Sequence, residues 1–359
     1  MQTMALRMRR KGIQVFIIAP LKGHEFYRAA RNVGGEFIQI SPASKNCINI
    51  MEIRKVDNSV NELLDGPTLD ASALAGKIQR LHIFFSLLIP DMSHEEKQLL
   101  DEALIKTYAR KGITHKNESL TDPQHPEQYK KMPILEDVYN VLLESEDTKR
   151  LAHILNRLVH GSASSFNQQT NVDLTNKYTV LDISELTGSS DLLTVGMFVA
   201  LDYVWDNIKA DRTKKKAIMI DEIWQLIGAS SNKLAAEFCL EIFKVIRGYG
   251  GAAIAATQDL SDFFSLDDGK YGRAIINNSK NKIILNLEQD EAQYVKDVLK
   301  LTRTEVRSIT QFERGEALIH SNNNKVPVVI KASAEEKEMI TTDRAELEAI
   351  LRKRQKEAT

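Results

Sequence analysis

Two adjacent carboxylates, Asp221 and Glu222, follow the apolar run Ala217 to Ile220. Such a run is typical of a buried strand. Two acids at its end would be costly to bury unless a metal ion or a phosphate-linked water compensates them. This is the form of a Walker B element, in which the first acid serves Mg²⁺ and the second prepares a water for attack on phosphate. The alternative is a strand that simply emerges into solvent, where acids cost little.

A second polar pair follows a second predicted strand. The segment AAIAATQ, residues 252–258, ends in Thr257 and Gln258. In open α/β sheets ligands bind at the carboxyl ends of the strands, so this pair is expected at the same edge as the acids. A glutamine there can hold a water or sense a γ-phosphate, or it can bond to loop backbone. Together the two segments predict the core of a nucleotide triphosphatase.

The elements that must position these groups alternate between strands and helices. This rhythm predicts an α/β fold with a mostly parallel sheet covered on both faces. Strands are expected at IQVFIIAP (13–20), 36–40, YTVLDI (178–183), before the acids and before Gln258. KIILNL, EALIHS and VPVVIK are expected to complete the same sheet.

Amphipathic helices interrupt this pattern, with apolar residues at helical spacing and Ser93 as an expected N-cap. They predict an inserted all-helical subdomain. The predicted division is residues 1–69 for the first part of the α/β core, 70–160 for the helical insertion, 161–332 for the rest of the core with the Walker B strand, and 333–359 for a charged C-terminal helix without an apolar stripe.

The bulk composition excludes several classes. The 48 basic and 49 acidic residues nearly cancel, so no global field favours nucleic acid or a membrane surface. No apolar run reaches the roughly 18 residues that a membrane span needs. The eight histidines and two cysteines show no metal-ligand spacing.

The order of the motifs resembles a known family. AIMIDEIWQLI, IRGYGGAAIAATQDLSDFF, IINNSKNKIILNL and ERGEALI resemble the VirB-type energising ATPases of type IV secretion and conjugative transfer, whose C-terminal half is a RecA-like motor. FNQQTNVDLTNKYTVLDISEL and GHEFYRAARNVGGEFIQISPASKNCINIMEI fit the same family, so the resemblance covers nearly the whole chain. It implies a RecA-like P-loop NTPase core with a helical insert. Single motifs are shared with the wider HerA–FtsK clade of DNA-pumping motors.

The resemblance implies roles for the candidate residues. Asp221 would help to hold Mg²⁺, Glu222 would polarise the attacking water, and Gln258, with Thr257, would lie beside the γ-phosphate. Arg247, eleven residues before Gln258, would reach the nucleotide of a neighbouring subunit. The alternative for Arg247 is a cation at the end of a helix.

Arg273 and Arg314 are weaker candidates for the same role in trans. The family likeness further implies ATP and Mg²⁺ as cofactors, a homo-oligomer (a hexamer), and other subunits of a membrane complex as partners. It implies a cytoplasmic location at the inner face of the cell membrane. DNA is a possible partner that the neutral charge does not indicate.

The chain departs from the family pattern in two places. Where the family has an acid followed by proline, this sequence has Ala19-Pro20, and where it has Asn-Pro, this sequence has Asn49-Ile50. Both departures concern the nucleotide edge and leave the Walker B assignment unaffected.

A phosphate-binding loop, G-x-x-x-x-G-K-[ST], does not occur in the 359 residues. The pairs Gly76-Lys77 and Gly269-Lys270 lack the hydroxyl residue and follow no strand. Residues 1–12 are typical of a helix end, so we expect a fragment cut just after the loop, whose missing strand belongs beside AAIAATQ. The sequence thus predicts the motor portion of a conjugative-transfer ATPase that is inactive alone. The alternatives are a DNA-pumping coupling protein and a non-catalytic scaffold remnant.

Overall fold

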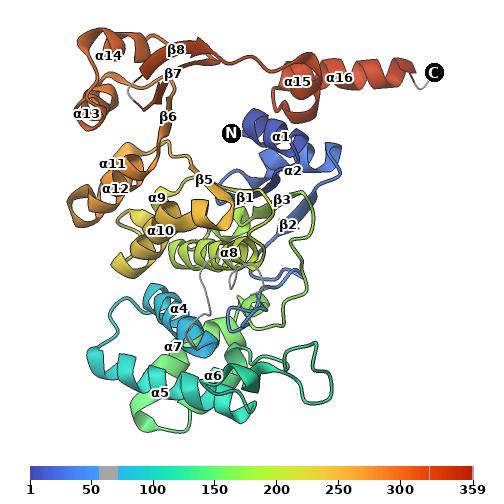
Figure 1. Ribbon diagram of the computed structural model, residues 1–359, viewed down its shortest axis with the longest axis vertical. Helices are drawn as coiled ribbons and strands as arrows, with labels where there is room; N and C mark the ends of the chain where they lie inside the picture. The colour runs from blue at the N-terminus through green and yellow to red at the C-terminus, as the bar shows by residue number, and fades with distance from the viewer. Residues whose placement is uncertain (56–71, 323, 358–359) are drawn as a thin grey trace.

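A five-stranded parallel sheet forms the centre of the computed structural model, which describes residues 1–55, 72–322 and 324–357 (Figure 1). Its strands lie in the order β2 (Glu36–Gln39), β3 (Tyr178–Asp182), β1 (Gln14–Ala19), β4 (Lys216–Ile220) and β5 (Gly251–Ala255). Every neighbouring pair is parallel. The predicted α/β fold with a parallel sheet is therefore confirmed. β5 lies at one edge of this sheet and pairs with β4.

Helices cover both faces of the sheet, which explains why its central strands are apolar throughout. Val15 and Ile17 of β1 face a core shared with α1 (Gln2–Arg10) and α2 (Gly23–Asn32). Phe16 and Ile18 belong to the larger core on the other face, beneath α8 (Ser190–Ala210).

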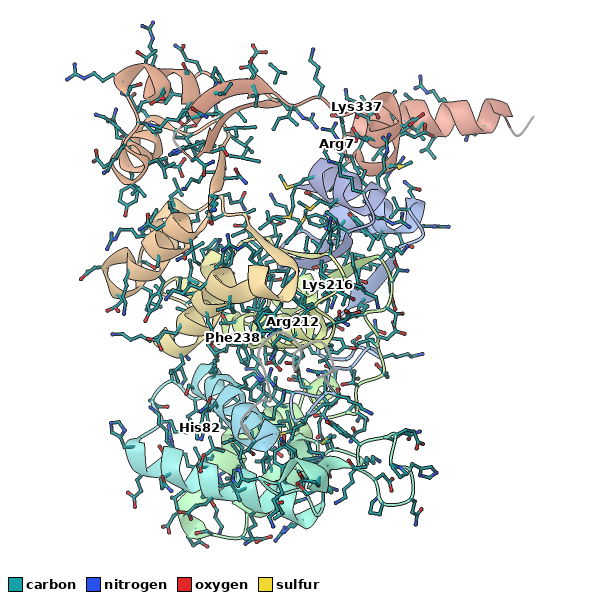
Figure 2. The ribbon with its side chains drawn as sticks, viewed as in Figure 1. Arg7, His82, Arg212, Lys216, Phe238 and Lys337 are labelled. Carbon is teal, nitrogen blue, oxygen red and sulfur yellow. The ribbon has the colours of Figure 1, made fainter. Side chains whose placement is uncertain are left out.

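The helix α8 is joined to β4 by a buried cation. The Lys216 ammonium donates to three carbonyl oxygens at the end of α8, those of Asn207 (2.7 Å), Ile208 (3.1 Å) and Asp211 (3.0 Å). These carbonyls have no partner within the helix and carry the negative end of its dipole, so a lysine suits them. Lys216 thereby fixes the start of the strand that leads to Asp221 (Figure 2).

The inserted helices form a bundle below the sheet in Figure 1. They are α4 (Ala73–Leu88), α5 (His94–Arg110), α6 (Leu135–Leu142) and α7 (Lys149–Val159). Ser93 caps α5 in a capping box with Glu96, as the sequence predicts. The bundle shares one continuous hydrophobic core with α8, so it is packed onto the sheet domain through α4. The predicted boundary between residues 69 and 70 lies outside the described residues.

Four further helices surround the ends of β4 and β5. They are α9 (Trp224–Ile227), α10 (Lys233–Val245), α11 (Leu260–Phe263) and α12 (Lys270–Asn278). Lys77 and Lys270, from the two Gly-Lys pairs, lie in α4 and α12, and neither pair follows a strand.

The last three predicted strands do not complete the main sheet, so that prediction is wrong. β6 (Asn281–Ile284), β7 (Glu316–Ser321) and β8 (Asn324–Val329) form a separate antiparallel sheet. One face of it buries Ile284 and Leu318 against α13 (Gln289–Leu299) and α14 (Arg303–Ile309). Apolar alternation predicts a strand but does not specify its neighbour; the tight β7–β8 connection favours local antiparallel pairing instead.

The C-terminal region contains two helices where the sequence predicts one. α15 (Ala334–Ile340) ends at Thr341, whose backbone is extended, and α16 (Arg344–Glu357) follows. α15 lies against α1 and α2, with Arg7 in a two-bond ion pair with Glu336 at 2.7 and 2.8 Å. Met339 and Ile340 also join the core of the first sheet face. The region thus makes local apolar contacts at the end of α15, although its sequence shows no continuous apolar stripe.

Candidate functional site

The chain turns sharply where β4 ends. The amide of Asp221 still donates to Ile18 of β1 at 3.0 Å, whereas Glu222 has a left-handed backbone with φ of 48°. That conformation is uncommon for a residue with a side chain. The amide of Ile223 then donates to Ala256, after β5, at 3.1 Å. The two acids are thus held by backbone bonds to both neighbouring strands.

The Glu222 residue is largely buried, with 5% of its surface exposed. Its Oε2 atom accepts a hydrogen bond from the Trp224 indole Nε1 at 2.9 Å. The backbone amide of Gln258 reaches the same oxygen at 3.4 Å. The structure therefore brings Glu222 and Gln258 together across β4 and β5, as their predicted place at one sheet edge requires.

Asp221 has an unusual electrostatic environment. Burial, followed by the neighbouring Glu222 carboxylate, raises the pKa of Asp221 to about 6. The positive charges of the Met1 amino group and of Lys22 act in the opposite direction but do not outweigh these effects. A carboxyl group in this state favours a cation beside it.

The start of α1 lies at the same edge of the sheet, since the Met1 amino group is close enough to influence Asp221. The positive end of a helix dipole and the unpaired amides of a first turn make such a position favourable for anions. The edge thus combines acids that suit a metal ion with a helix start that suits phosphate.

Thr257 and Gln258 differ in what they contribute. The Thr257 hydroxyl donates to the Asp259 carbonyl at 3.0 Å, so it closes the loop after β5 and does not approach the acids. Gln258 meets Glu222 through its backbone, and its residue is exposed at the edge. Of the two, only Gln258 has a side chain that is available to a ligand.

Arg247 lies far from the acids within the chain. It occupies a 3₁₀ turn, Ile246–Tyr249, immediately before β5, and it is exposed. Gln258 follows the other end of that five-residue strand, and because a strand rises about 3.3 Å per residue, the ends of β5 alone are roughly 13 Å apart. A contact between Arg247 and the acids of its own chain is therefore excluded, and a role in trans stays a prediction.

Of the weaker arginine candidates, Arg273 bonds to the Asp268 carbonyl of its own loop, and Arg314 is exposed beside β7. Neither lies at the edge that holds the acids.

The sequence reasoning overlooked Trp224 and Asp182. Trp224 stands within the quoted motif, and Asp182 ends β3 buried beside Gly23, where a Cβ atom would lie 1.7 Å from its Oδ1. A strand-terminal acid was the available signal for Asp182.

A second group of buried charges joins α4 to α8. The Lys77 ammonium is 3.1 Å from Asp202 Oδ2, and Arg80 lies 3.0 Å from Asp202 Oδ1. Asp206 pairs with Arg80 and, at 3.0 Å, with Arg54. Burial lowers the pKa of Lys77 to about 8. Burial works to raise the pKa of Asp206, but Lys77, Arg80 and the nearby cations hold it well below its usual range. Asp202 and Asp206 are therefore both paired with cations of the same chain.

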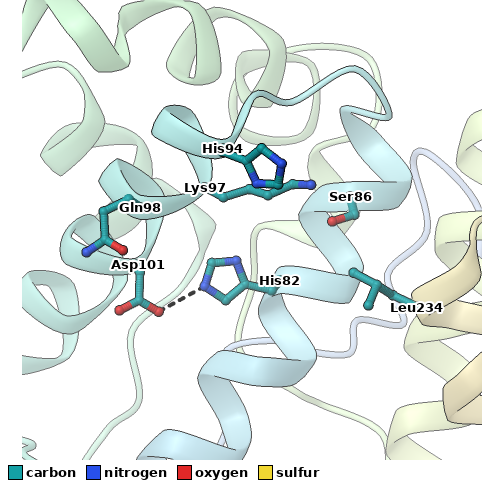
Figure 3. A pocket seen from close by; sticks show the side chains of 7 residues that line it. All are labelled: His82, Ser86, His94, Lys97, Gln98, Asp101 and Leu234. Atoms are coloured by element: carbon teal, nitrogen blue, oxygen red, sulfur yellow. Dashed lines mark hydrogen bonds and ion pairs between the residues drawn. The ribbon is translucent and has the colours of Figure 1, made fainter.

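A surface pocket of about 350 Å³ lies on the helical bundle and not at the acids. It is formed mainly by α4 and α5, with Leu234 of α10 at its side (Figure 3). His82 Nε2 and Asp101 Oδ1 are 2.9 Å apart across it. This pair joins two packed helices and is partly exposed. A structural contact between the helices is therefore enough to explain it.

Comparison with known proteins adds a family match. The TraG P-loop domain family matches residues 128–358, which is more than half of the chain. The chain belongs to this family. Protein TraC of Escherichia coli (strain K12) is 33% identical over 116 residues, which are 32% of this chain and 13% of TraC. The chain thus spans only a small part of that relative.

Solved structures agree with the TraG-family assignment. VirB4 of Thermoanaerobacter pseudethanolicus is similar with a TM-score of 0.81 and 25% identity, over 93% of this chain and 86% of that one. The plasmid coupling protein TrwB, in complex with the ATP analogue ADPNP, has a TM-score of 0.58 and 13% identity over 95% of this chain and 84% of that one. The resemblance to VirB-type conjugative-transfer ATPases that the sequence predicts is confirmed.

The described residues contain neither a membrane-spanning helix nor a cluster of metal-ligating side chains. No helix among them is both long and apolar enough to cross a membrane. Within residues 1–55, 72–322 and 324–357, no three histidine, cysteine or acidic side chains are gathered as a metal site. A metal ion at Asp221 would therefore need ligands from outside these side chains, such as water and phosphate oxygens.

Proposed function

We propose that this chain is the motor portion of an ATPase of type IV secretion or conjugative transfer, which hydrolyses ATP with Mg²⁺. The observation that carries the proposal is the acid pair at the end of β4, where Glu222 is buried, Asp221 is half-buried with a raised pKa, and no cation of the described residues forms an ion pair with either acid. Membership of the TraG P-loop domain family supports it.

The residues present supply part of a binding site for Mg²⁺ and ATP. Asp221 would hold the ion, directly or through a water, because Mg²⁺ prefers carboxylate, phosphate and water oxygens. The bound ion would neutralise charge on the transferred phosphate. Glu222 would accept a proton from the attacking water, and the exposed Gln258 side chain would orient that water or the γ-phosphate. The phosphate-binding loop itself does not occur in this sequence.

The same proposal includes an assembly. A neighbouring copy would present Arg247 to the nucleotide, as expected in a hexameric ring at the inner face of the cell membrane, beside other subunits of the machine. The helical insertion at residues 70–160 and the core at 1–69 and 161–332 remain the proposed division. The separate β6–β8 sheet would be an added module of the second core segment.

Calorimetry with Mg-ATP tests the chain of 359 residues directly. Without the loop amides, lysine and hydroxyl, we expect no dissociation constant below roughly millimolar, about −4 kcal/mol. A micromolar constant that Asp221→Asn weakens would contradict this expectation and reveal a substitute phosphate site.

A second protein tests the catalytic assignment. A strand, a phosphate loop and a helix start of the TraG family are joined before Met1 to give what we call the loop-bearing protein. In it, Glu222→Gln should leave nucleotide affinity near normal and reduce turnover by about 10²–10⁴-fold, the usual contribution of a positioned base. Turnover within a factor of three would remove Glu222 from the mechanism.

The two alternative functions give different results in the same experiment. A loop-bearing protein that neither binds nor hydrolyses ATP would favour the scaffold remnant. Hydrolysis that depends on DNA, with DNA affinity falling steeply as salt increases, would favour a DNA-pumping coupling protein.

A further inference from the structure

Trp224 contacts the Glu222 carboxylate through one oxygen only. Its indole Nε1 donates to Oε2 at 2.9 Å, and the Gln258 amide approaches the same Oε2 at 3.4 Å. An N–H donor on a carboxylate forms a charge-assisted bond, which is roughly twice as strong as a neutral one. The orientation of the whole carboxylate is therefore set by two donors on one side.

The other carboxylate oxygen remains open. Oε1 accepts no hydrogen bond from the described residues, and it is not among their buried polar atoms without a partner. An unpaired oxygen that is absent from that group keeps some accessible surface, although the residue as a whole is only 5% exposed. One oxygen is anchored, and the other is unpaired and partly accessible at the carboxyl edge of the sheet.

The backbone around Trp224 leaves the indole little freedom. The Ile223 amide is bound to Ala256 at 3.1 Å, and Ile223 and Leu226 are fully buried on either side of Trp224. The Gly228 amide donates to the Trp224 carbonyl at 2.6 Å, and a Cβ atom on Gly228 would lie 2.7 Å from that oxygen. The donor is thus held by a packed turn.

We propose that Trp224 is a positioning residue for Glu222: its indole N–H anchors Oε2 so that Oε1 is presented to the attacking water. This inference rests on the proposed function, in which Glu222 is the base. A base contributes most when its accepting atom is within hydrogen-bond reach of the proton it removes, so holding the carboxylate in one orientation raises turnover and leaves nucleotide affinity unchanged. The competing explanation is that Trp224 only packs against the core, where its ring also lies.

The hydrogen bond can be tested in the chain of 359 residues by NMR with ¹⁵N-labelled tryptophan. The sequence contains two tryptophans, so Trp205 supplies an internal reference signal. Glu222→Gln should move the Trp224 indole proton upfield, because an amide oxygen is a weaker acceptor than a carboxylate. The matched control is Asp221→Asn, which removes the adjacent charge but no bond to Trp224. A Trp224 signal that responds equally to both changes, or to neither, would overturn the proposal.

The positioning role is tested in the loop-bearing protein with Trp224→Phe, which keeps an aromatic ring and removes the N–H donor. We expect kcat to fall about tenfold with KM for ATP unchanged, whereas Trp205→Phe should stay within a factor of two. A rise in KM without a fall in kcat, or turnover equal to that of the unsubstituted protein, would contradict the positioning role. Trp224 would then contribute only packing.

The experiments distinguish a failure of this inference from a failure of the proposed function. If Glu222→Gln itself retains full turnover, the assignment of the base is wrong, whatever Trp224 does. If Glu222→Gln abolishes turnover and Trp224→Phe has no effect, only the positioning role is wrong. The NMR result on the unextended chain holds independently should the Trp224→Phe protein fold poorly.

Discussion

Acidic side chains are withdrawn from solvent in two places in the molecule. In one place they are paired with cations, and in the other they are not. Between α4 and α8, Asp202 and Asp206 are enclosed with Lys77, Arg80 and Arg54 at ion-pair distance. At the end of β4, Asp221 lies beside another acid, and its pKa rises to about 6. The first group is complete within the chain and joins two helical layers. In the part of the chain that the structure describes, the second has no cation at ion-pair distance, as a site that receives a metal ion and phosphate would require.

The largest expected effect comes from removing a cation from the complete group. Lys77→Met should lower the free energy of unfolding by about 3–5 kcal/mol, because Asp202 stays buried without that partner. Urea denaturation measures the change. Lys111→Met is the control, since Lys111 is 3.0 Å from Asp137 in a pair that is 38% and 31% exposed. Such a pair contributes less than about 1 kcal/mol. Equal losses of unfolding free energy in the two variants would mean that burial of the α4–α8 ion group adds nothing to its effect on stability.

The incomplete group should receive a cation from another copy. In the loop-bearing protein, Arg247→Ala should reduce turnover at least about 10²-fold, equivalent to about 3 kcal/mol. Mixing Arg247→Ala subunits with Glu222→Gln subunits should restore some activity, because some interfaces then combine an intact site with an intact arginine. If no mixing ratio restores activity in assembled protein, Arg247 does not act in trans.

The raised pKa of Asp221 predicts a pH-dependent stability with a definite sign. Below about pH 3 the carboxyl is protonated in both the folded and the unfolded chain, so it has no effect. As pH rises through about 6, the folded chain acquires a charge that it disfavours, and stability is lost. Asp221→Asn should therefore be about 1–2 kcal/mol more stable than the unsubstituted chain at pH 8, after allowance for solvent screening, and nearly equal at pH 3. Urea midpoints at the two pH values test this, and a gain of equal size at both would contradict it.

The smallest expected effect is that of Mg²⁺ alone. At 10 mM and pH 8 it should stabilise the chain by less than about 1 kcal/mol, because the ion retains its waters when no phosphate helps to hold it. Asp221→Asn should abolish that small gain, and sodium chloride of equal ionic strength should not reproduce it. A gain that survives the substitution would place the ion elsewhere.

Much of the sheet and the placement of the candidate residues at one edge could be predicted from the sequence, because each motif follows directly on a strand. The acids end an apolar strand, and Gln258 ends the next, so parallel pairing was enough to bring them to one edge. The second sheet could not be predicted in this way. Ile284 and Leu318 show strand periodicity, but periodicity does not specify the neighbouring strand, which depends on the packing of α13 and α14.

The buried ion group was also beyond the sequence. Lys77 stands in a Gly-Lys pair that looked relevant only as a false phosphate loop, and its partner Asp202 lies 125 residues away. Trp224 could have been noticed in the motif, but its bond to Glu222 depends on the left-handed turn at Glu222, which no residue-level propensity favours.

The contact between α1 and α15 has a consequence for how this chain is made. Arg7 and Glu336 are separated by 329 positions. A ribosome that adds about 5–20 residues per second needs roughly 20 to 60 s to synthesise the segment between them. During that interval the surface of α1 that α15 later covers is exposed, although α1 and its strand β1 have long left the ribosome. Chaperones that protect nascent chains would therefore find their longest opportunity at this N-terminal helix, and stalled synthesis before residue 336 would leave it uncovered.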